Sequence, residues 1–279
     1  MKSAIWMIGV LLGADLPGIG QPVERDIVIY GATPGGIAAA VQAKRMGRSV
    51  VLLEPTDRIG GLTTGGLGCT DIGSKWAYGG LARDFYRDVK RHYSDDANWT
   101  WQKRKDYDYR GVEGGYPKYA DEMWLFEPSA ALKILERWEK DEGLEIRRNA
   151  PLERSKAKVE GKGQQRRIVS FITKDGTEYR GKVFIDATYE GDLLAAAGCS
   201  YAVGREDNAV YGETLNGAQP DVAYGYHRFQ KGVDPYVKKG DPASGLLPGI
   251  DPEPMKALGT GDRRVQAYCY RMCLTDVPA

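Results

Sequence analysis

DIVIYGATPGGIAAA, residues 26–40, is the stretch that decides the fold of this 279-residue chain. Its first five residues contain a continuous apolar, β-branched run, which is typical of a parallel strand covered on both faces. A glycine turn follows, and residues 35–47 then carry apolar side chains at helical spacing, with basic residues before the final glycine. The segment SVVLL, residues 49–53, indicates a second buried strand. Together these elements predict a right-handed βαβ unit with two parallel strands.

Segments further along the chain extend this unit into a larger domain. Alternating segments between residues 152 and 179, separated by turn signals, predict an antiparallel meander at the side of the sheet. The predicted fold class is α/β: a Rossmann-like parallel sheet with helices on both faces, the meander, and an inserted or partial substrate region. Further helices are expected at 81–93, 128–142 and 193–197, a third strand at 144–148 and another buried parallel strand at 182–186.

The N-terminus has the pattern of a secretory signal peptide. Lys2 supplies a basic start, residues 4–12 form an apolar segment, and residues 18–20 (GIG) offer a small-residue cleavage site before Gln21. This apolar segment is too short to span a bilayer, which needs about 20 residues, so no integral membrane span is predicted. We expect residues 1–20 to direct export to the periplasm or the outside of the cell. The alternative is a cytoplasmic protein with an ordinary N-terminal tail.

Composition places the chain among globular proteins and argues against a nucleic-acid partner. Hydrophobic residues make up 42 % and charged residues 28 %, both near globular averages. The 39 basic and 38 acidic residues leave a formal charge of +1, too balanced to attract a polyphosphate backbone non-specifically. Four scattered cysteines and two histidines indicate neither a disulfide framework nor a metal site, so we expect buried thiols and no metal ligands.

The turn at residues 31–36 (GATPGG) matches a dinucleotide-binding fingerprint with one departure. Gly31 holds the tight-turn place and Gly36 the place where helix and strand pack closely. Thr33 occupies the position where glycine normally lets a diphosphate approach. The turn still aims free amides and a helix N-terminus at a diphosphate, and the Thr33 hydroxyl can add a hydrogen bond. The alternative is an ordinary glycine turn between a strand and a helix.

Two features after the second strand strengthen this interpretation. Glu54 ends that strand, where an acidic side chain accepts hydrogen bonds from a ribose diol and disfavours the 2′-phosphate of NADP. Residues 58–64 (RIGGLTT) follow, inside a glycine-rich stretch at 56–80 that we expect to be a loop. The paired glycines let the backbone pass close under a dinucleotide, while Arg58 and the threonines can bond phosphate or ribitol oxygens. For Glu54 alone, the alternative is a surface carboxylate.

These residues give the chain its resemblance to a known family. The order of strand, glycine turn, acid and RxGG doublet resembles the glutathione-reductase-like FAD flavoproteins. The segments YGATPGGIAAA and GGLTTGGLG are similar to the corresponding segments of the family of FAD-dependent oxidoreductases. Some members carry the label xanthan lyase, which these residues do not support chemically. VFIDATYEGD, residues 183–192, resembles the strand and ATG-type turn that close such domains, with Tyr189 where glycine is commoner.

The resemblance implies an FAD cofactor and an oxidoreductase whose flavin takes hydride or electrons from an unidentified small-molecule substrate and passes them to an electron acceptor. It divides the chain into a signal peptide (1–20), an FAD-binding domain (25–200, with an insertion at about 72–125) and a partial substrate domain (201–279). Family members are longer and end in a further FAD-contacting strand and helix, which nothing before Ala279 matches. This implies a fragment or the loss of those parts.

Position within the motifs assigns the cofactor-binding residues, whereas no catalytic residue is assigned. Leu152 is placed beside adenine by position only, and the residues after the strand at 182–186 are placed near the flavin end. The cofactor-binding residues implied by the resemblance are Gly31, Ala32, Thr33, Pro34, Gly35, Gly36, Glu54, Arg58, Gly60, Gly61, Leu62, Thr63, Leu152, Ala187 and Thr188.

Two other functions stay open on the sequence alone. A truncated or non-catalytic dinucleotide-binding module would keep the cradle and lack an active site. An NAD-dependent dehydrogenase would share the turn and the acid, but the RxGG doublet disfavours it.

Overall fold

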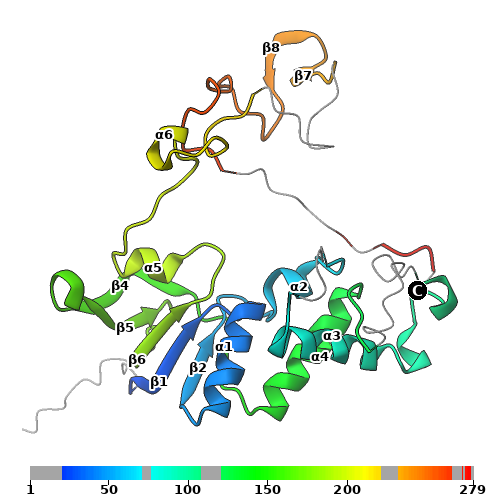
Figure 1. Ribbon diagram of the computed structural model, residues 1–279, viewed down its shortest axis with the longest axis vertical. Coiled ribbons are helices and arrows are strands. Elements are labelled where there is room, and N and C mark those ends of the chain that lie inside the picture. The colour runs from blue at the N-terminus through cyan, green and yellow to red at the C-terminus, as the bar shows by residue number, and fades with distance from the viewer. Residues whose placement is uncertain are drawn as a thin grey trace, which may run out of the picture. The chain divides into compact units, whose positions relative to one another are not determined.

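The computed structural model describes residues 21–70, 77–107, 121–220, 232–265, 272 and 274–277. Their contacts form two compact units, the first ending at Cys199 and the second beginning at Ser200, and the few described residues after 271 belong to the first. The predicted signal peptide and parts of the predicted insertion at 72–125 lie outside the described residues. The large sheet lies in the first unit (Figure 1).

The first unit contains six strands and five helices among the described residues. The strands are β1 (Val23–Tyr30), β2 (Val50–Leu53), β3 (Ile146–Arg147), β4 (Leu152–Glu160), β5 (Arg167–Thr173) and β6 (Glu178–Asp186). The helices are α1 (Pro34–Arg45), α2 (Gly61–Gly65), α3 (Gly80–His92), α4 (Pro128–Asp141) and α5 (Asp192–Ala196). Short 3₁₀ turns lie at Asp96–Asn98, Arg104–Asp106 and Gly163–Gln165.

The six strands form one sheet in the order β3-β2-β1-β6-β5-β4. β3, β2, β1 and β6 run parallel, and Tyr30 lies opposite Leu53 on one side and Asp186 on the other. The carboxyl ends of β1, β2 and β6 therefore meet at one edge. β4, β5 and β6 pair antiparallel as a meander. The predicted α/β fold with a parallel sheet and a meander is confirmed.

One strand, β6, belongs to both parts of the sheet. The sequence interpretation separated the end of the meander at Tyr179 from a buried strand at 182–186. The structure has a single strand whose first residues pair with β5 and whose length pairs with β1. β5 pairs only with residues 178–180 of β6. In the later part of the strand Val183 joins neither hydrophobic cluster and is 50 % exposed instead of buried.

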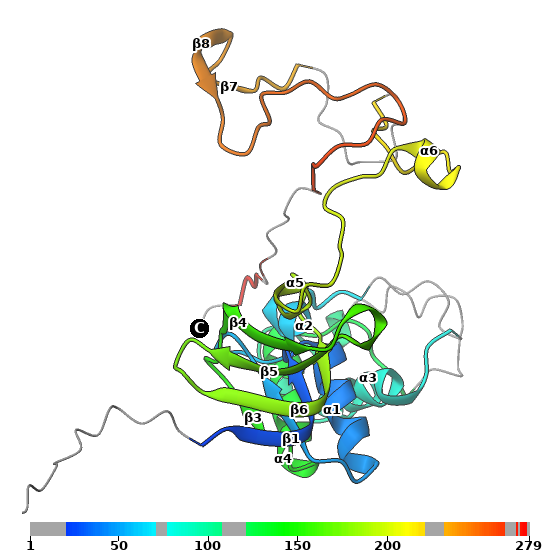
Figure 2. The same cartoon turned by 90° about the vertical axis from the view of Figure 1, so that its left-hand side faces the viewer.

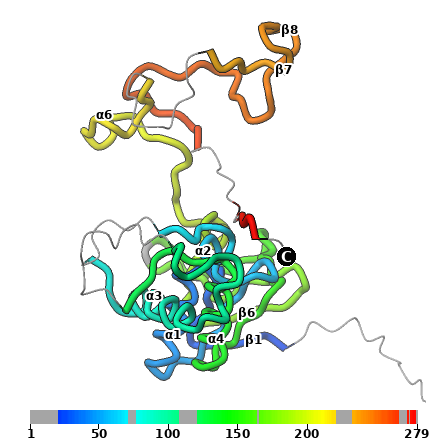
Figure 3. Tube along the Cα trace, turned by 90° about the vertical axis from the view of Figure 1, so that its right-hand side faces the viewer, coloured from blue at the N-terminus to red at the C-terminus, as the bar shows by residue number. Residues whose placement is uncertain are grey.

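The two faces of the sheet are covered by different structures. On one face α1, α3 and α4 pack together, and their apolar residues join Ile29 and Leu52 in one core cluster (Figures 1 and 3). On the other face Val28 and Leu53 pack with Phe171 of the meander. Instead of the second helical layer that we expected, the described residues place the meander and the short α5 there (Figure 2).

Local sequence explains where α1 and α2 begin. Thr33 has an extended backbone, and its hydroxyl accepts a hydrogen bond from Gly36 N (3.3 Å), which caps α1; Pro34 follows at the start of the helix. α2 was not predicted, because it lies inside the glycine-rich stretch. Gly60 precedes it with a φ of +90°, which favours glycine, so the glycine allows this short helix to start.

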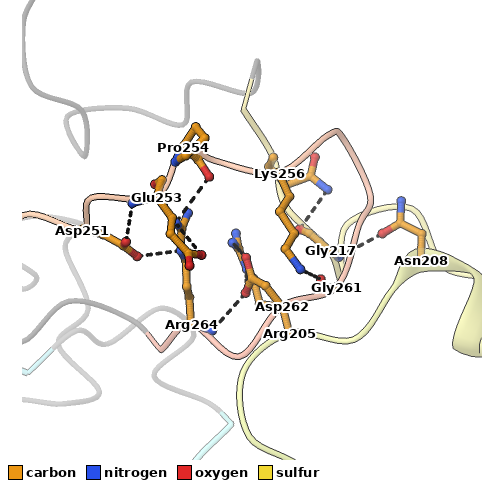
Figure 4. Close-up of polar contacts among 11 residues, drawn as sticks. Arg205, Asn208, Gly217, Asp251, Glu253, Pro254, Lys256, Gly261, Asp262 and Arg264 are labelled. Carbon is orange, nitrogen blue, oxygen red and sulfur yellow. Dashed lines mark hydrogen bonds and ion pairs between the residues drawn. The ribbon is translucent and has the colours of Figure 1, made fainter.

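The second unit contains α6 (Asn208–Tyr211) and an antiparallel hairpin of β7 (Tyr236–Lys238) and β8 (Asp241–Leu246). No periodicity predicted these elements. Arg205 and Asp262 join two distant segments through backbone hydrogen bonds and an ion pair (Figure 4). Among the described residues of this unit, Ala218 is the one buried hydrophobic residue. Polar contacts therefore carry much of its local structure.

Candidate functional site

A cavity of about 900 Å³ lies at the carboxyl ends of β1, β2 and β6, and we call it the cradle cavity. This is the edge where parallel α/β sheets bind their ligands. Seven of the fifteen predicted cofactor-binding residues line it, so residues far apart in the sequence meet at one site. Its lining residues are Tyr30, Gly31, Thr33, Glu54, Pro55, Thr56, Arg58, Gly61, Pro151, Leu152, Glu153, Arg154, Lys174, Thr188, Tyr189, Glu190 and Asp192.

Glu54 is the buried carboxylate of the cradle cavity, with 7 % of the residue exposed. One oxygen accepts a hydrogen bond from Ala32 N (2.9 Å). The other accepts from Thr56 N (2.9 Å) and Thr56 Oγ1 (2.8 Å). An ionised carboxylate has about four acceptor positions, so a position remains for a ligand hydroxyl. The Glu54 carboxylate thereby joins the end of β2 to the glycine turn and to the loop that contains Thr56.

The glycine turn packs closely against the segment that follows β6. Gly31 has a φ of +101°, and a Cβ added there would lie 2.8 Å from Thr188 N. A Cβ added at Gly36 would overlap the carbonyl oxygen of Gly31 and would lie 3.2 Å from Ala187 Cβ. Both positions therefore require glycine: Gly31 for its backbone angle, and Gly36 for the packing of α1 against the turn.

Thr33 does not offer its hydroxyl to a ligand as we expected. Thr33 Oγ1 donates to Ala187 O (2.7 Å) and accepts from Gly36 N (3.3 Å). A hydroxyl has one proton, so its donor is already used. This expectation was wrong because the side chain caps α1 and binds the segment after β6. Thr33 still lines the cradle cavity.

The RxGG segment forms another wall of the cradle cavity. Arg58 Nε and Nη2 both donate to Thr64 O (2.9 and 2.5 Å), which holds the guanidinium against α2. Thr64 Oγ1 in turn donates to Ile59 O (2.6 Å). Gly60 N donates to Ala32 O (2.7 Å), which brings the doublet beside the glycine turn. Arg58 thus orders its own loop.

Tyr30 connects the strand ends beneath the cavity. Tyr30 Oη accepts a hydrogen bond from Leu152 N (2.9 Å), and Tyr30 O accepts one from Ala187 N (2.8 Å). Burial raises the pKa of the Tyr30 phenol above its ordinary value, so the hydroxyl stays neutral. Asp186 then accepts from Thr188 N (3.0 Å) and Thr188 Oγ1 (2.6 Å). These bonds bring three predicted residues, Leu152, Ala187 and Thr188, to the same edge of the sheet.

Three other predicted residues face a second cavity. Pro34, Gly35 and Thr63 line a space of about 510 Å³ among α1, α2, α3 and α4, which we call the apolar cavity. Its other lining residues are Ala38, Leu67, Cys69, Thr70, Leu81, Ala82, Phe85, Tyr86, Phe126, Leu135 and Trp138. The remaining predicted residues, Ala32, Gly36, Gly60, Leu62 and Ala187, line neither cavity.

The expectation of buried thiols was wrong for the two cysteines that the structure describes. Cys69 is exposed and lines the apolar cavity, and Cys199 is exposed at the end of the first unit. The other two cysteines lie outside the described residues.

Sequence reasoning missed several residues of the cradle cavity. Thr56 stands two residues after Glu54, and a hydroxyl at that spacing is a local signal for a side-chain-stabilised turn. Arg154 of β4 pairs with Asp192 at the start of α5 (2.9 Å), and only the folded chain brings those two segments together. The sequence identifies Tyr189 only as a departure from glycine and assigns it no contact.

Within the described ranges, no three His, Cys, Asp or Glu side chains are placed to share a metal ion. In the same part of the chain, no helix is both long and apolar enough to cross a bilayer.

Comparison with known proteins finds short matches to two curated relatives. Putrescine oxidase of Kocuria rosea is 42 % identical over 57 residues, which are 19 % of this chain and 12 % of that protein. Mitochondrial dihydrolipoyl dehydrogenase of Cricetulus griseus is 39 % identical over 49 residues, which are 18 % of this chain and 9 % of that protein. The matched segments thus span about a tenth of each relative's length.

A solved structure and a family profile match longer stretches. L-proline dehydrogenase from P. horikoshii is similar with a TM-score of 0.40 and 16 % identity, over 67 % of this chain and 59 % of that one. The profile of the family described as FAD dependent oxidoreductase matches residues 26–279, which include the glycine turn, Glu54 and the RxGG doublet. The chain therefore belongs to the FAD dependent oxidoreductase family.

Proposed function

We propose that this chain binds FAD in the cradle cavity and oxidises a small-molecule substrate, with a second acceptor removing the electrons. The observation that carries the proposal is Glu54, a buried carboxylate beside the glycine turn with an acceptor position still open. Family membership supports FAD as the ligand. When bound, FAD supplies a ring that takes up hydride or electrons.

The residues of the cradle cavity fit an extended dinucleotide. Glu54 has an acceptor position for a ribose hydroxyl. In the first turn of α1, proline at position 34 has no N–H and Gly36 N is bonded to Thr33 Oγ1, so Gly35 N is the group left to donate to a diphosphate. Close packing of Gly31 against Thr188 leaves no room for a side chain at position 31. In this proposal the ribose is held by Glu54, the diphosphate by residues 31–36, the ribitol side by Arg58 and residues 60–63, adenine by Leu152, and the flavin end by Ala187 and Thr188.

The apolar cavity is the proposed substrate side. It adjoins the cradle cavity through two shared elements, because Thr33 lines one cavity and Pro34 the other, and Gly61 lines one and Thr63 the other. Aromatic and aliphatic side chains make up most of its wall, which excludes water and favours an apolar substrate. The chain's part in the reaction is then to position that substrate beside the cofactor.

Binding of FAD is tested with the purified protein and a Glu54→Gln variant. The wild-type protein should be yellow after reconstitution, and its colour should bleach when a reductant is added. Glu54→Gln keeps one acceptor oxygen and loses the charge, so FAD affinity should fall about 10- to 100-fold, measured by calorimetry.

Glu153→Gln is the matched control. Glu153 lines the same cavity, and within the described part of the chain its side chain accepts only from Ser155 Oγ (3.2 Å). That variant should bind FAD with wild-type affinity. A folded wild-type protein that stays colourless with FAD, or a Glu54→Gln variant that retains FAD as tightly as the wild type, contradicts the proposal.

The two alternatives give different results in the same experiments. A non-catalytic module would bind FAD without turnover against any combination of substrate and acceptor. An NAD-dependent dehydrogenase would show no visible flavin absorbance and would bind the nicotinamide cofactor instead.

We further propose that residues 1–20 direct export and are removed before Gln21. The proposal rests on the basic start, the apolar segment and the small residues at 18–20. A flavoprotein exported through the general secretory route would load its cofactor after translocation, because that route carries unfolded chains.

A further inference from the structure

Tyr189 connects two walls of the cradle cavity that are far apart in the sequence. Leu62 N donates a hydrogen bond to Tyr189 Oη (3.0 Å), across a separation of 127 residues. Leu62 lies in α2, which follows the RxGG doublet, while Tyr189 lies in the turn between β6 and α5. Both Tyr189 and Gly61 line the cavity. The side chain therefore bridges the two walls.

Glycine at position 61 is what admits the Tyr189 ring. A Cβ added at Gly61 would overlap Tyr189 Oη and would lie 3.0 Å from Tyr189 Cε2. The ring thus rests directly on the glycine doublet. Any other residue at position 61 would push the tyrosine side chain off the wall.

Each wall is held by several hydrogen bonds, whereas the hydroxyl of the tyrosine between them is held by one. On the β6 side, Asp186 accepts from Thr188 N and from Leu194 N (3.0 and 2.8 Å). On the α2 side, Arg58 donates to Thr64 O (2.9 Å). The Tyr189 side chain can turn about its χ1 and χ2 bonds once the hydrogen bond to Leu62 N breaks. It is the element of this bridge that can open.

Tyr189 contributes little to the core. The residue is 57 % exposed and belongs to neither hydrophobic cluster. Among the residues that the structure describes, its side chain bonds to Leu62 N alone. A large aromatic side chain that is mostly exposed, yet placed across a ligand-sized cavity, suits a role in that cavity better than a role in stability.

We propose that Tyr189 is a latch across the cradle cavity that slows both the binding and the release of FAD. This inference rests on the proposed FAD site. In the closed state the hydroxyl accepts from Leu62 N and the ring covers Gly61, on the ribitol side of the site. FAD passes when the side chain swings out, so the latch retains the cofactor once it has closed again.

The first test follows the hydrogen bond without any ligand. The Leu62 amide should exchange slowly with deuterated solvent in the wild-type protein, because it is bonded to Tyr189 Oη. In a Tyr189→Phe variant the same amide should exchange about 10-fold faster, as read by NMR or mass spectrometry. An unchanged exchange rate overturns the latch.

The second test measures the rate constants for FAD. Tyr189→Phe keeps the ring and loses one hydrogen bond, so association and release should both be about 3- to 10-fold faster than in the wild type. Tyr189→Ala removes the ring as well and should accelerate both steps further. Tyr211→Phe is the control, because Tyr211 is an exposed tyrosine on α6, 68 % exposed, outside the first unit. Its rates should be those of the wild type.

Binding of AMP distinguishes an effect on the latch from an effect on the ribose site. AMP fills only the adenosine half, so its affinity should stay within about two-fold in the Tyr189 variants, whereas Glu54→Gln should weaken both AMP and FAD. If the wild type binds FAD but the Tyr189 variants release it at the wild-type rate, the latch is wrong and the FAD site stands. If the folded wild type binds neither FAD nor AMP, the site fails and the latch fails with it.

Discussion

Gly35 and Gly36 are neighbours in the first turn of α1, yet their surroundings differ sharply. At Gly36 an added Cβ would overlap the carbonyl oxygen of Gly31, which is backbone and cannot move aside. At Gly35 the nearest atom to an added Cβ is Thr33 Oγ1 at 3.8 Å, an ordinary contact distance, and the residue is exposed. One glycine is required by packing and the other is not.

Alanine substitutions at these two positions should therefore have opposite effects. Gly36→Ala should lower the free energy of unfolding by about 3 kcal/mol, because the helix must move away from the turn. Gly35→Ala should raise it by about 0.5–1 kcal/mol, because alanine loses less conformational entropy in a helix. Urea unfolding without added cofactor measures both values. Equal effects would contradict the close packing of α1 on the turn.

At the scale of elements, Asp26 ties three strands together. It lies in β1, and its carboxylate accepts from Ser49 N (3.1 Å) and Ser49 Oγ (2.7 Å) just before β2. Lys182 Nζ of β6 donates to the same carboxylate (2.7 Å). The hydrogen bond from Lys182, followed by those from Ser49, lowers the pKa of Asp26 well below its ordinary value of 3.8. The charged form is the one that joins the strands.

The lowered pKa predicts a specific dependence of stability on pH. The folded state holds the Asp26 proton less tightly than the unfolded state. The contribution of Asp26 to stability is therefore complete above the unfolded pKa and is lost progressively as pH falls from there through the lower folded pKa. Asp26→Asn should therefore have a lower urea midpoint than the wild type near pH 6, and the difference should shrink towards about pH 3. Asp57→Asn, at an exposed position, is the control. A difference that stays constant between these two pH values would contradict the role of Asp26.

At the scale of the whole molecule, the two units are stabilised differently. The first holds two hydrophobic clusters, and all seven predicted residues that line the cradle cavity belong to it. In the second, the ion pair of Arg205 with Asp262 and the contacts of Arg264 with Asp251 and Glu253 join the loops (Figure 4). The cofactor cradle is therefore a property of the first unit.

The proposed export leaves that unit whole. β1 begins at Val23, so cleavage before Gln21 removes no residue of the sheet. In a bacterial host, the exported fraction should contain a protein whose intact mass corresponds to a start at Gln21. Replacing Leu11 in the apolar segment by aspartate should leave the full-length chain in the cytoplasm. If the wild-type chain is found only in the cytoplasm, with Met1 either retained or removed, the result supports the cytoplasmic alternative.

The sequence predicted the structural features that depend on residues close together in the chain. The strand at 26–30, the glycine turn, α1 and Glu54 at the end of β2 follow from side-chain periodicity and from the backbone needs of glycine and proline. α3 and α4 begin and end within a residue or two of their predicted bounds, because their apolar spacing and terminal residues are local. The same holds for the position of the meander.

What depends on contacts between distant segments was decided only by the tertiary structure. The sequence could not show that β6 belongs to both sheet regions, or that the Thr33 hydroxyl donates to Ala187 O. The partners concerned, β1 for β6 and Ala187 for Thr33, are more than a hundred residues away in the chain. The same reason applies to the hydrogen bond from Leu62 N to Tyr189 Oη. Periodicity reports which face of an element is buried, whereas the partner that buries it is chosen by the packing of the whole chain.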